Sequence, residues 1–201
     1  MIALKSDYYM SPEEYLEFEQ HSDIKHEYID GEVYAMAGTT KAHNTISLNL
    51  AILFREKLKN SNCQTFMADI KVNISNKKRF FYPDIVVTCD DNDDVNAYDI
   101  KFPKVIVEVL SESTEKFDRG KKFQYYRTIP SLQEYILVSS QEYLIECFRR
   151  TKNDLWTLQT YEGLNTILRI ENLAIDSPLS EIYATLSFDS VSELQSDNDH
   201  S

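Results

Sequence analysis

The chain has 201 residues, of which 42% are hydrophobic and 12% aromatic, and its formal net charge is -12. This length suits one domain, and this composition can bury a sizeable core, which excludes a globally disordered chain. The negative charge argues against a broad basic surface that would grip nucleic acid through many phosphates. We expect a single domain over residues 1–186, followed over 187–201 by an acidic tail without regular structure.

The three cysteines, Cys63, Cys89 and Cys147, are odd in number and widely spaced. Their spacing matches neither a CxxC zinc pattern nor a disulfide framework. The N-terminus does not resemble a signal peptide, and no apolar stretch is long enough to span a bilayer. We therefore expect a protein of the reducing cytoplasm that does not enter a membrane.

The first predicted elements are a helix and a hairpin. Ser11 is followed by a proline and two acids, which is the pattern of a capped helix start and predicts a helix over 11–19. Asp30-Gly31 between two strand-like runs predicts a two-residue hairpin turn within 26–36. Glu27 precedes this turn, either as an ordinary solvated edge charge or as an accessory acid of a site.

A second helix is predicted over about 43–57, with Thr39 or Thr40 as its cap. Apolar residues recur along it close to the period of an α-helix, and His43 lies on the same stripe in the first turn. The histidine therefore points inward. It is either a core histidine with satisfied ring nitrogens or a residue at the mouth of a site that contacts a phosphate or a bound water.

The middle of the chain predicts strands. Segment 66–74 alternates apolar and polar side chains, as a half-exposed strand does. The run 80–88 is expected to pair with it as a hairpin. Because proline donates no ladder hydrogen bond, Pro83 should interrupt this pairing just before Asp84. The acidic loop over 90–103 is expected on the surface.

The strand predicted over 105–110 is an apolar run with one carboxylate, Glu108, in its middle. Such a run is typical of a strand buried on both faces, where an ionised carboxylate is costly unless a cation or several hydrogen bonds compensate it. Asp84 has a similar setting at the start of its own apolar run. Two acids on neighbouring buried strands suggest a metal site.

A βαβ unit with parallel strands is predicted around this strand. Its helix covers about 114–128 and its second strand 134–139. The remaining predicted elements are strands at 143–150 and 155–161 flanking a turn, a short strand at 166–170 and a short helix at 178–186.

One face of the predicted βαβ helix carries Thr114, Asp118, Lys122 and Tyr126, which are spaced by four. The simple interpretation is an exposed Asp118–Lys122 ion pair. The alternative is that Lys122 reaches back over the sheet to Asp84 and Glu108. Two acids that hold Mg²⁺ and a lysine that offsets charge on the phosphate oxygens suffice for phosphodiester hydrolysis. These residue types do not separate DNA from RNA or from smaller phosphate esters.

The order Pro83-Asp84 and then, downstream, Glu108 resembles the PD-(D/E)XK nuclease superfamily. More closely, the chain is similar over about residues 8–175 to the Uma family of restriction-endonuclease-like proteins. The segments and residues that carry this similarity are 26–32, His43, 82–87, 107–114, Asp118, Lys122, Tyr126 and 134–137.

The resemblance implies an α/β (α+β) restriction-endonuclease-like fold, with a mixed central β-sheet flanked by helices and extra β-hairpins. It also implies a Mg²⁺- or Mn²⁺-dependent DNA endonuclease, in which Asp84 and Glu108 hold the metal and Lys122 completes the catalytic set. The superfamily motif expects lysine two residues after the glutamate, where this chain has Leu110. In the Uma pattern the following helix supplies the lysine, at the position of Lys122. Lys121 would point about 100° away on an α-helix.

The family pattern also includes Glu27, His43 and Asp118 as accessory residues, and Asp118 could orient Lys122 or contact the metal indirectly. Because a charge of -12 is unfavourable for gripping DNA, we expect a basic groove formed in a homodimer, or a required partner. Two alternatives stay open. One is a catalytically weak or inactive module of this fold that binds nucleic acid or a protein partner. The other is a metal-dependent phosphohydrolase acting on small substrates.

Overall fold

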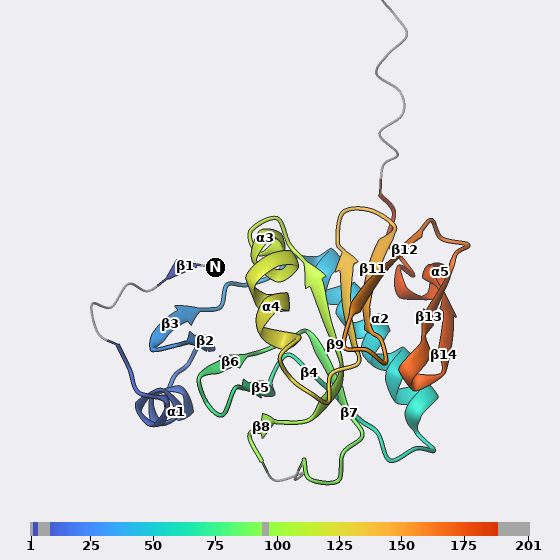
Figure 1. Ribbon diagram of the computed structural model, residues 1–201. Coiled ribbons are helices and arrows are strands. Elements are labelled where there is room, and N and C mark those ends of the chain that lie inside the picture. The colour runs from blue at the N-terminus through green and yellow to red at the C-terminus, as the bar shows by residue number, and fades with distance from the viewer. Residues whose placement is uncertain (1, 4–8, 94–96, 189–201) are drawn as a thin grey trace, which may run out of the picture.

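The computed structural model describes residues 2–3, 9–93 and 97–188 (Figure 1). Within these ranges the strands form two six-stranded mixed sheets and one two-stranded sheet, and helices flank them. The predicted α+β class with mixed sheets and flanking helices is therefore confirmed. The structure differs from the prediction in one respect: the predicted single central sheet is divided into two six-stranded sheets.

The first sheet contains the predicted hairpin. Its turn lies at Asp30 and Gly31, whose φ angles of 50° and 105° are the positive values that a two-residue hairpin turn requires. All strand pairs are antiparallel except β5 with β8. In spatial order the strands are β1 (Ile2–Ala3), β3 (Glu32–Ala35), β2 (His26–Ile29), β6 (Arg79–Phe81), β5 (Lys71–Ile74) and β8 (Asp99–Ile100).

The second sheet contains the predicted βαβ unit, because its β9 and β10 are parallel and the other pairs antiparallel. Its spatial order is β12 (Trp156–Glu162), β11 (Leu144–Arg150), β10 (Glu134–Ser139), β9 (Pro103–Leu110), β7 (Ile85–Thr88) and β4 (Gln64–Met67). A separate hairpin joins β13 (Ile167–Ile170) and β14 (Ile175–Pro178) through a 3-10 turn, η2 (Glu171–Leu173).

The helices begin where the capping residues predict. Ser11 and Glu14 form a capping box at the start of α1 (Pro12–Gln20), and Thr40 caps α2 (Lys41–Leu58). The helix of the βαβ unit consists of α3 (Glu115–Phe117), a π-helical segment η1 (Asp118–Lys122) and α4 (Phe123–Tyr126). A short helix, α5 (Leu179–Ile182), lies within the predicted range.

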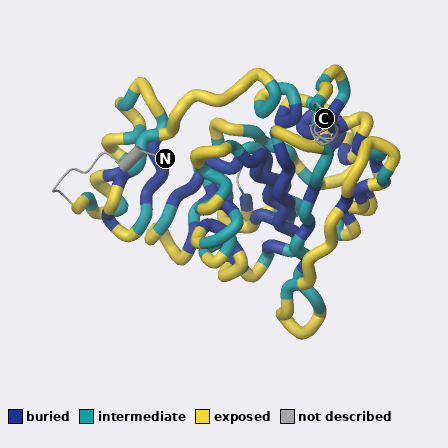
Figure 2. The backbone as a smooth tube through the Cα atoms, turned by 90° about the horizontal axis from the view of Figure 1, so that it is seen from above, coloured by how far each residue is buried: buried dark blue, intermediate teal, exposed yellow. Residues whose placement is uncertain are grey.

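Opposite faces of β9 meet different helices. Val105, Val107 and Val109 pack in one hydrophobic cluster with residues of α2, whereas Ile106 and Leu110 pack in another with residues of α4. Accordingly, α2 lies behind the second sheet in Figure 1 and the α3–η1–α4 segment lies in front of it. Figure 2 shows the buried segments gathered at the centre, with exposed segments around them. Glu108, between Val107 and Val109, therefore faces the α3–η1–α4 segment.

The prediction of one continuous strand over 66–74 is wrong. The chain leaves β4 at Ala68, whose φ is 52°, and enters β5 in the other sheet. The run 80–88, which pairs with it, is also interrupted, just before Asp84 and beside Pro83 as predicted. As a result, β6 pairs with β5 and β7 pairs with β4. The alternation of apolar residues continues on both sides of the break and therefore did not reveal it. Both runs cross between the sheets, and Asp84 lies at this crossing.

The prediction of no disulfide is also wrong. Cys63 directly precedes β4 and Cys89 directly follows β7, and Gln64 pairs with Thr88. The same register brings the two cysteines together, and they form a disulfide, while Cys147 is free and buried. Spacing along the sequence did not reveal this register. Because disulfides are rare in a reducing cytosol, the cysteines no longer support that location, which stays a prediction.

The acidic loop is only partly on the surface. Asp91 and Asn92 are exposed, but Asp93 is buried and accepts hydrogen bonds from Thr88 Oγ1 (2.6 Å) and from the backbone N–H of Lys101 (2.8 Å). Residues 94–96 of this loop lie outside the described ranges, as does the predicted tail from residue 189. Among the residues that the structure describes, no helix is both long enough and apolar enough to cross a bilayer.

Candidate active site

Asp84 and Glu108 come from neighbouring antiparallel strands. Ile85 of β7 pairs with Val107 of β9, so one further step of the same register places Asp84 opposite Glu108. Asp84 Oδ2 accepts a hydrogen bond of 2.7 Å from the backbone N–H of Val109, which fixes its carboxylate at this position. The side chain of Glu108 is 5% exposed and that of Asp84 is 21% exposed. Solvent therefore reaches this pair from the side of Asp84.

Lys122 lies at the centre of a buried group of acids. Its Nζ is 2.9 Å from Glu108 Oε1, 3.0 Å from Glu27 Oε1 and 3.5 Å from Asp118 Oδ1. We call these four residues the Lys122 cluster. Glu27 belongs to β2 in the first sheet, so the cluster joins both sheets to the helical segment. Lys121 is exposed, as the phase of the helix predicted.

Tyr126 also contacts the cluster, although the sequence did not lead us to assign it to the site. Its hydroxyl donates a hydrogen bond of 3.1 Å to Glu108 Oε1. The sequence feature that could have indicated this contact is the spacing of four residues between Lys122 and Tyr126. In an α-helix such a spacing drifts by about 40° per step. The wider π-helical turn from Asp118 to Lys122 offsets part of this drift, which helps these side chains to face Glu108 together.

The acids of the Lys122 cluster outnumber its single ammonium group, and burial makes their charge costly. Burial raises the pKa of Glu108 well above its ordinary value, with the charges of Asp118 and Asp84 acting in the same direction and Lys122 acting against them. Burial likewise raises the pKa of Glu27. For Lys122, burial favours the neutral amine, but Glu108 and Glu27 outweigh it and raise its pKa. The lysine is therefore an ammonium ion at neutral pH.

His43, in the first turn of α2, lies at the exposed side of this group. Its Nε2 is 3.3 Å from Asp84 Oδ2, and its side chain is 13% exposed. Its Nδ1 is buried without a hydrogen-bond partner among the described residues. A core histidine would have both ring nitrogens satisfied. The geometry therefore favours the interpretation of His43 as a residue at the mouth of a site.

The donor set suits a hard divalent cation. Among the residues that the structure describes, no group of three or more His, Cys, Asp or Glu side chains is arranged to hold a metal ion. Mg²⁺, however, is commonly bound by one or two carboxylates together with waters and substrate phosphates. Asp84 and Glu108 offer two carboxylates, and the surplus of buried acids around Lys122 is a charge that a divalent cation would compensate.

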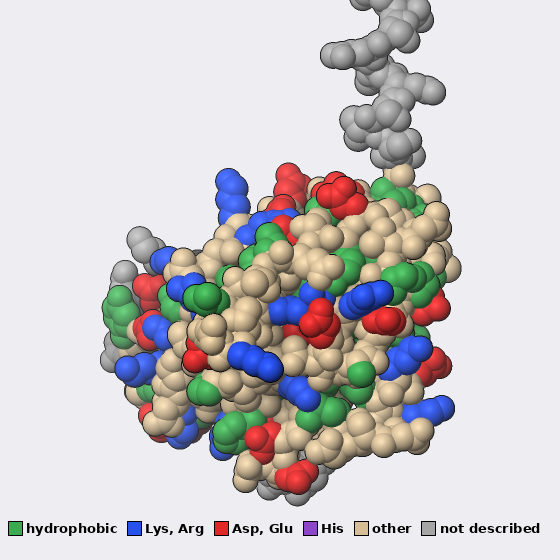
Figure 3. Space-filling view, turned by 45° about the vertical axis from the view of Figure 1, so that its right-hand side comes forward, with side chains coloured by type: hydrophobic (Ala, Val, Ile, Leu, Met, Phe, Trp, Pro, Cys, Tyr) green, Lys and Arg blue, Asp and Glu red, His purple; other side chains and the backbone are tan. Residues whose placement is uncertain are grey.

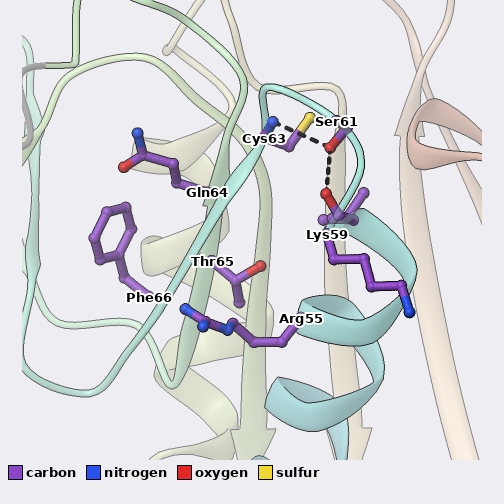
Figure 4. Close-up of a pocket in the computed structure, with 8 residues that line it drawn as sticks. Arg55, Lys59, Ser61, Cys63, Gln64, Thr65 and Phe66 are labelled. Atoms are coloured by element: carbon purple, nitrogen blue, oxygen red, sulfur yellow. Dashed lines mark hydrogen bonds between the residues drawn. The ribbon is translucent and has the colours of Figure 1, made fainter.

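An open hollow of about 380 Å³ lies elsewhere, where the end of α2 meets β4 (Figure 4). Its lining includes Arg55 of α2, Lys59 directly after α2, and Thr65 and Phe66 of β4. In Figure 4 the side chain of Arg55 extends toward Thr65. The predicted site residues do not line this hollow, so it is separate from the Lys122 cluster.

The mixed sheets and the buried acid–lysine cluster together define a restriction-endonuclease-like α+β protein. The family model described as "Uma2: Putative restriction endonuclease" matches residues 12–176. Two proteins of Synechocystis sp. (strain ATCC 27184 / PCC 6803 / Kazusa) are similar over most of their length. "Uncharacterized protein slr1290" is 38% identical over 179 residues, which is 89% of this chain and 94% of that protein. "Uncharacterized protein sll1609" is 30% identical over 177 residues, covering 87% and 100%.

A solved structure shares the fold. The crystal structure of "a putative nuclease belonging to DUF820" from Anabaena variabilis ATCC 29413 superposes with a TM-score of 0.71 and covers 87% of this chain and 97% of that chain. The sequence identity is 14%, so this similarity concerns the fold alone. The family match, which covers more than half of the chain, shows that the chain belongs to the Uma2 family, as the resemblance of its motifs predicted.

Proposed function

We propose that this chain is a divalent-metal-dependent endonuclease that hydrolyses phosphodiester bonds in DNA. The observation that carries the proposal is the contact of Lys122 with Glu108, directly beside Asp84, in a chain of a restriction-endonuclease family. Residues 1–186 would form the single domain that houses this site.

Asp84 and Glu108 would hold the metal ion. Mg²⁺ or Mn²⁺ bound there would polarise the phosphate and lower the pKa of a bound water. Tyr126 orients Glu108 through its hydrogen bond to Oε1, and the Val109 amide fixes Asp84. Because both carboxylates are already held in place, little reorganisation accompanies binding.

Lys122 would stabilise the charge that develops on the phosphate oxygens. Its raised pKa keeps the ammonium charged, and burial strengthens its electrostatic effect. Glu27 and Asp118 hold this ammonium from two other directions. His43 stands at the exposed side, where a substrate phosphate or a water would meet its ring.

The surface gives little electrostatic help with DNA. In Figure 3, basic and acidic side chains are interspersed over the face shown and do not form one broad basic patch. With a net charge of -12, tight binding to duplex DNA would need either a groove formed between two copies of the chain or a partner.

Plasmid cleavage in the presence of Mn²⁺ tests the proposal. We expect wild-type protein to nick and linearise supercoiled plasmid, and the Glu108→Ala variant to leave it intact. Glu112→Ala, which removes an exposed acid near the end of the same strand, is the matched control and should cleave like wild type. If wild type and Glu108→Ala behave alike, the catalytic claim is wrong.

The second candidate is a non-catalytic module of the same fold that binds nucleic acid or a protein partner. The acidic surface and the enclosure of Lys122 by three carboxylates favour it. It predicts undetectable metal binding by calorimetry together with unchanged partner binding in the Asp84→Ala variant. The endonuclease proposal predicts the opposite result for metal binding.

A further inference from the structure

A second hollow, of about 450 Å³, lies between the β2–β3 hairpin and the α3–η1–α4 segment. We call it the hairpin hollow. Tyr34 and Glu32 line it from the hairpin, Phe117, Lys121 and Tyr125 line it from the helical segment, and Tyr9 stands at its edge. Tyr9 packs against Gly31 of the hairpin turn, where any Cβ would collide with the tyrosine ring.

The hairpin hollow adjoins the Lys122 cluster through both of its walls. On the hairpin, Tyr34 pairs with Glu27, so these two side chains are neighbours on one face of the sheet. Behind the helical segment, the buried Phe81 ring lies between a lining residue of the hollow and the cluster. It lies 6.0 Å from the ring of Tyr125, on the side of the hollow, and 5.5 Å from Lys122 Nζ, on the side of the acids.

Aromatic residues make up half of the lining of the hollow. Tyr34, Phe117 and Tyr125 are partly buried, and Tyr9 is 72% exposed. The Arg79 guanidinium stacks 4.1 Å from the centre of the Tyr125 ring, which helps to hold this ring in place. Aromatic faces of this kind stack on nucleobases of any sequence, because every base has a π-face.

The charges of the hollow suit a base better than a phosphate. Asp30 is paired with Arg79, and Glu32 accepts a hydrogen bond from the Tyr34 hydroxyl, so carboxylate oxygens lie beside the rings. These oxygens repel a phosphate but can accept a hydrogen bond from the amino group of a base. Lys121 is exposed at the rim, and no described carboxylate lies within salt-bridge distance of it, so it suits the phosphate that follows this base.

We propose that the hairpin hollow is a subsite for one unpaired nucleobase of the substrate. The inference rests on the proposed nuclease function and names its substrate class: single-stranded DNA, or DNA with a locally unpaired base beside the cleaved phosphate. A base inside a duplex is stacked and cannot enter such a hollow unless it is extruded. Stacking also supplies affinity without positive charge, which matters in a chain whose net charge is -12.

Fluorescence of 2-aminopurine, an adenine analogue that is quenched on stacking, tests the proposal. In EDTA, the full-length Glu108→Gln variant should bind an oligonucleotide without cleaving it. We expect it to quench 2-aminopurine in a single-stranded oligonucleotide and not in the matching duplex. Tyr34→Leu or Tyr125→Leu in this background should weaken binding about tenfold, which is within the usual effect of losing one stacking ring. Tyr34→Phe keeps the ring and should retain the quenching.

Tyr98→Leu is the matched control, because Tyr98 is 75% exposed and does not line the hollow. It should bind like the parent. An oligonucleotide with an abasic position in place of 2-aminopurine requires no new variant and should bind about tenfold more weakly. Equal affinity for abasic and intact oligonucleotides, or equal quenching by the duplex, would overturn the subsite.

The subsite and the nuclease function fail separately. If wild type cleaves plasmid but no quenching is seen, the proposed nuclease function stands and the proposed base subsite is wrong. If quenching depends on Tyr34 and Tyr125 but no metal-dependent cleavage is seen, the proposed nuclease function is wrong and the protein is a module that binds single strands.

Discussion

Two buried cations in this chain, Lys122 and Arg149, stand in contrast to each other. Arg149 Nε bonds to the fully buried Glu134 at 2.8 Å, and its second acid, Glu171, is 65% exposed. The other donors of Arg149 reach neutral groups, including the Tyr161 hydroxyl at 2.6 Å. Lys122, by comparison, has three carboxylates within 3.5 Å, and each of them is at most 5% exposed.

The difference lies in the balance of charge. One buried acid against one buried cation, whose other donors bond to neutral groups, is a structural solution that ties β10, β11 and β12 together. Three acids outnumber the one cation that they contact, and ionising all of them in a buried place is costly. Such a surplus is expected where a cation or a substrate supplies the missing charge. We therefore interpret the Arg149 network as structural and the Lys122 cluster as functional.

The largest expected effect follows from removing Lys122. In Lys122→Met three buried acids lose the cation that they contact, and the free energy of unfolding should fall by about 3–5 kcal/mol. Urea denaturation measures this change, and plasmid cleavage should be lost as well. Lys121→Met is the matched control, and because its side chain is exposed the change should stay within about 0.5 kcal/mol. An equally stable Lys122→Met protein would show that these acids do not depend on the ammonium group.

The next prediction compares one acid from each network. Glu134→Gln leaves Arg149 without a buried acid and should cost about 3 kcal/mol of unfolding free energy. Glu108→Gln leaves Lys122 with two acids and relieves their repulsion, so stability should stay equal or rise by about 1 kcal/mol. The same denaturation experiment gives both values. Losses of equal size would contradict the distinction between the two networks.

The pH dependence of stability follows from the raised pKa of Glu108. As pH rises above 4.5, the ordinary value for this group, the unfolded chain releases the Glu108 proton while the folded chain retains it. The unfolded state then binds fewer protons, so stability falls with rising pH until the folded pKa is passed. In EDTA, the difference in melting temperature between Glu108→Gln and wild type should grow over this interval. A constant difference would contradict the raised pKa.

The smallest expected effect concerns His43 at the edge of the cluster. His43→Gln removes the ring beside Asp84 Oδ2 without touching Lys122, so stability should change little. The cleavage rate should fall about tenfold, as is common when a partner of a metal ligand is lost. His21→Gln, at an exposed histidine that ends α1, is the control. An unchanged cleavage rate in His43→Gln would contradict a role in the site and would indicate that His43 is a core packing residue.

Local signals in the sequence predicted much of this fold. The cap at Ser11, the turn at Asp30-Gly31 and the interruption at Pro83 all depend on neighbouring residues, and all are confirmed. Features that depend on strand register or on crossing between sheets were not predictable in this way. The break at Ala68 and the Cys63–Cys89 disulfide are of this second kind.

The same distinction applies to the site. Glu108 was conspicuous as an acid in an apolar run, and the helix phase correctly separated Lys122 from Lys121. Glu27 stayed ambiguous because only the pairing of β2 with β6 brings it toward the second sheet. The hydrogen bond of Tyr126 depends on a π-helical turn, which no spacing rule for α-helices reveals.

Calorimetric titration with Mn²⁺ tests most directly whether a divalent cation binds at the surplus acids of the Lys122 cluster. We expect wild type to bind Mn²⁺ and to release protons as it binds, because metal competes with the protons that acids of raised pKa retain. Proton release is read from the dependence of the binding enthalpy on the buffer. Glu134→Gln should bind likewise, while Glu108→Gln and Asp84→Asn should not. Equal binding by wild type and Glu108→Gln, or no binding by wild type, would contradict the metal site.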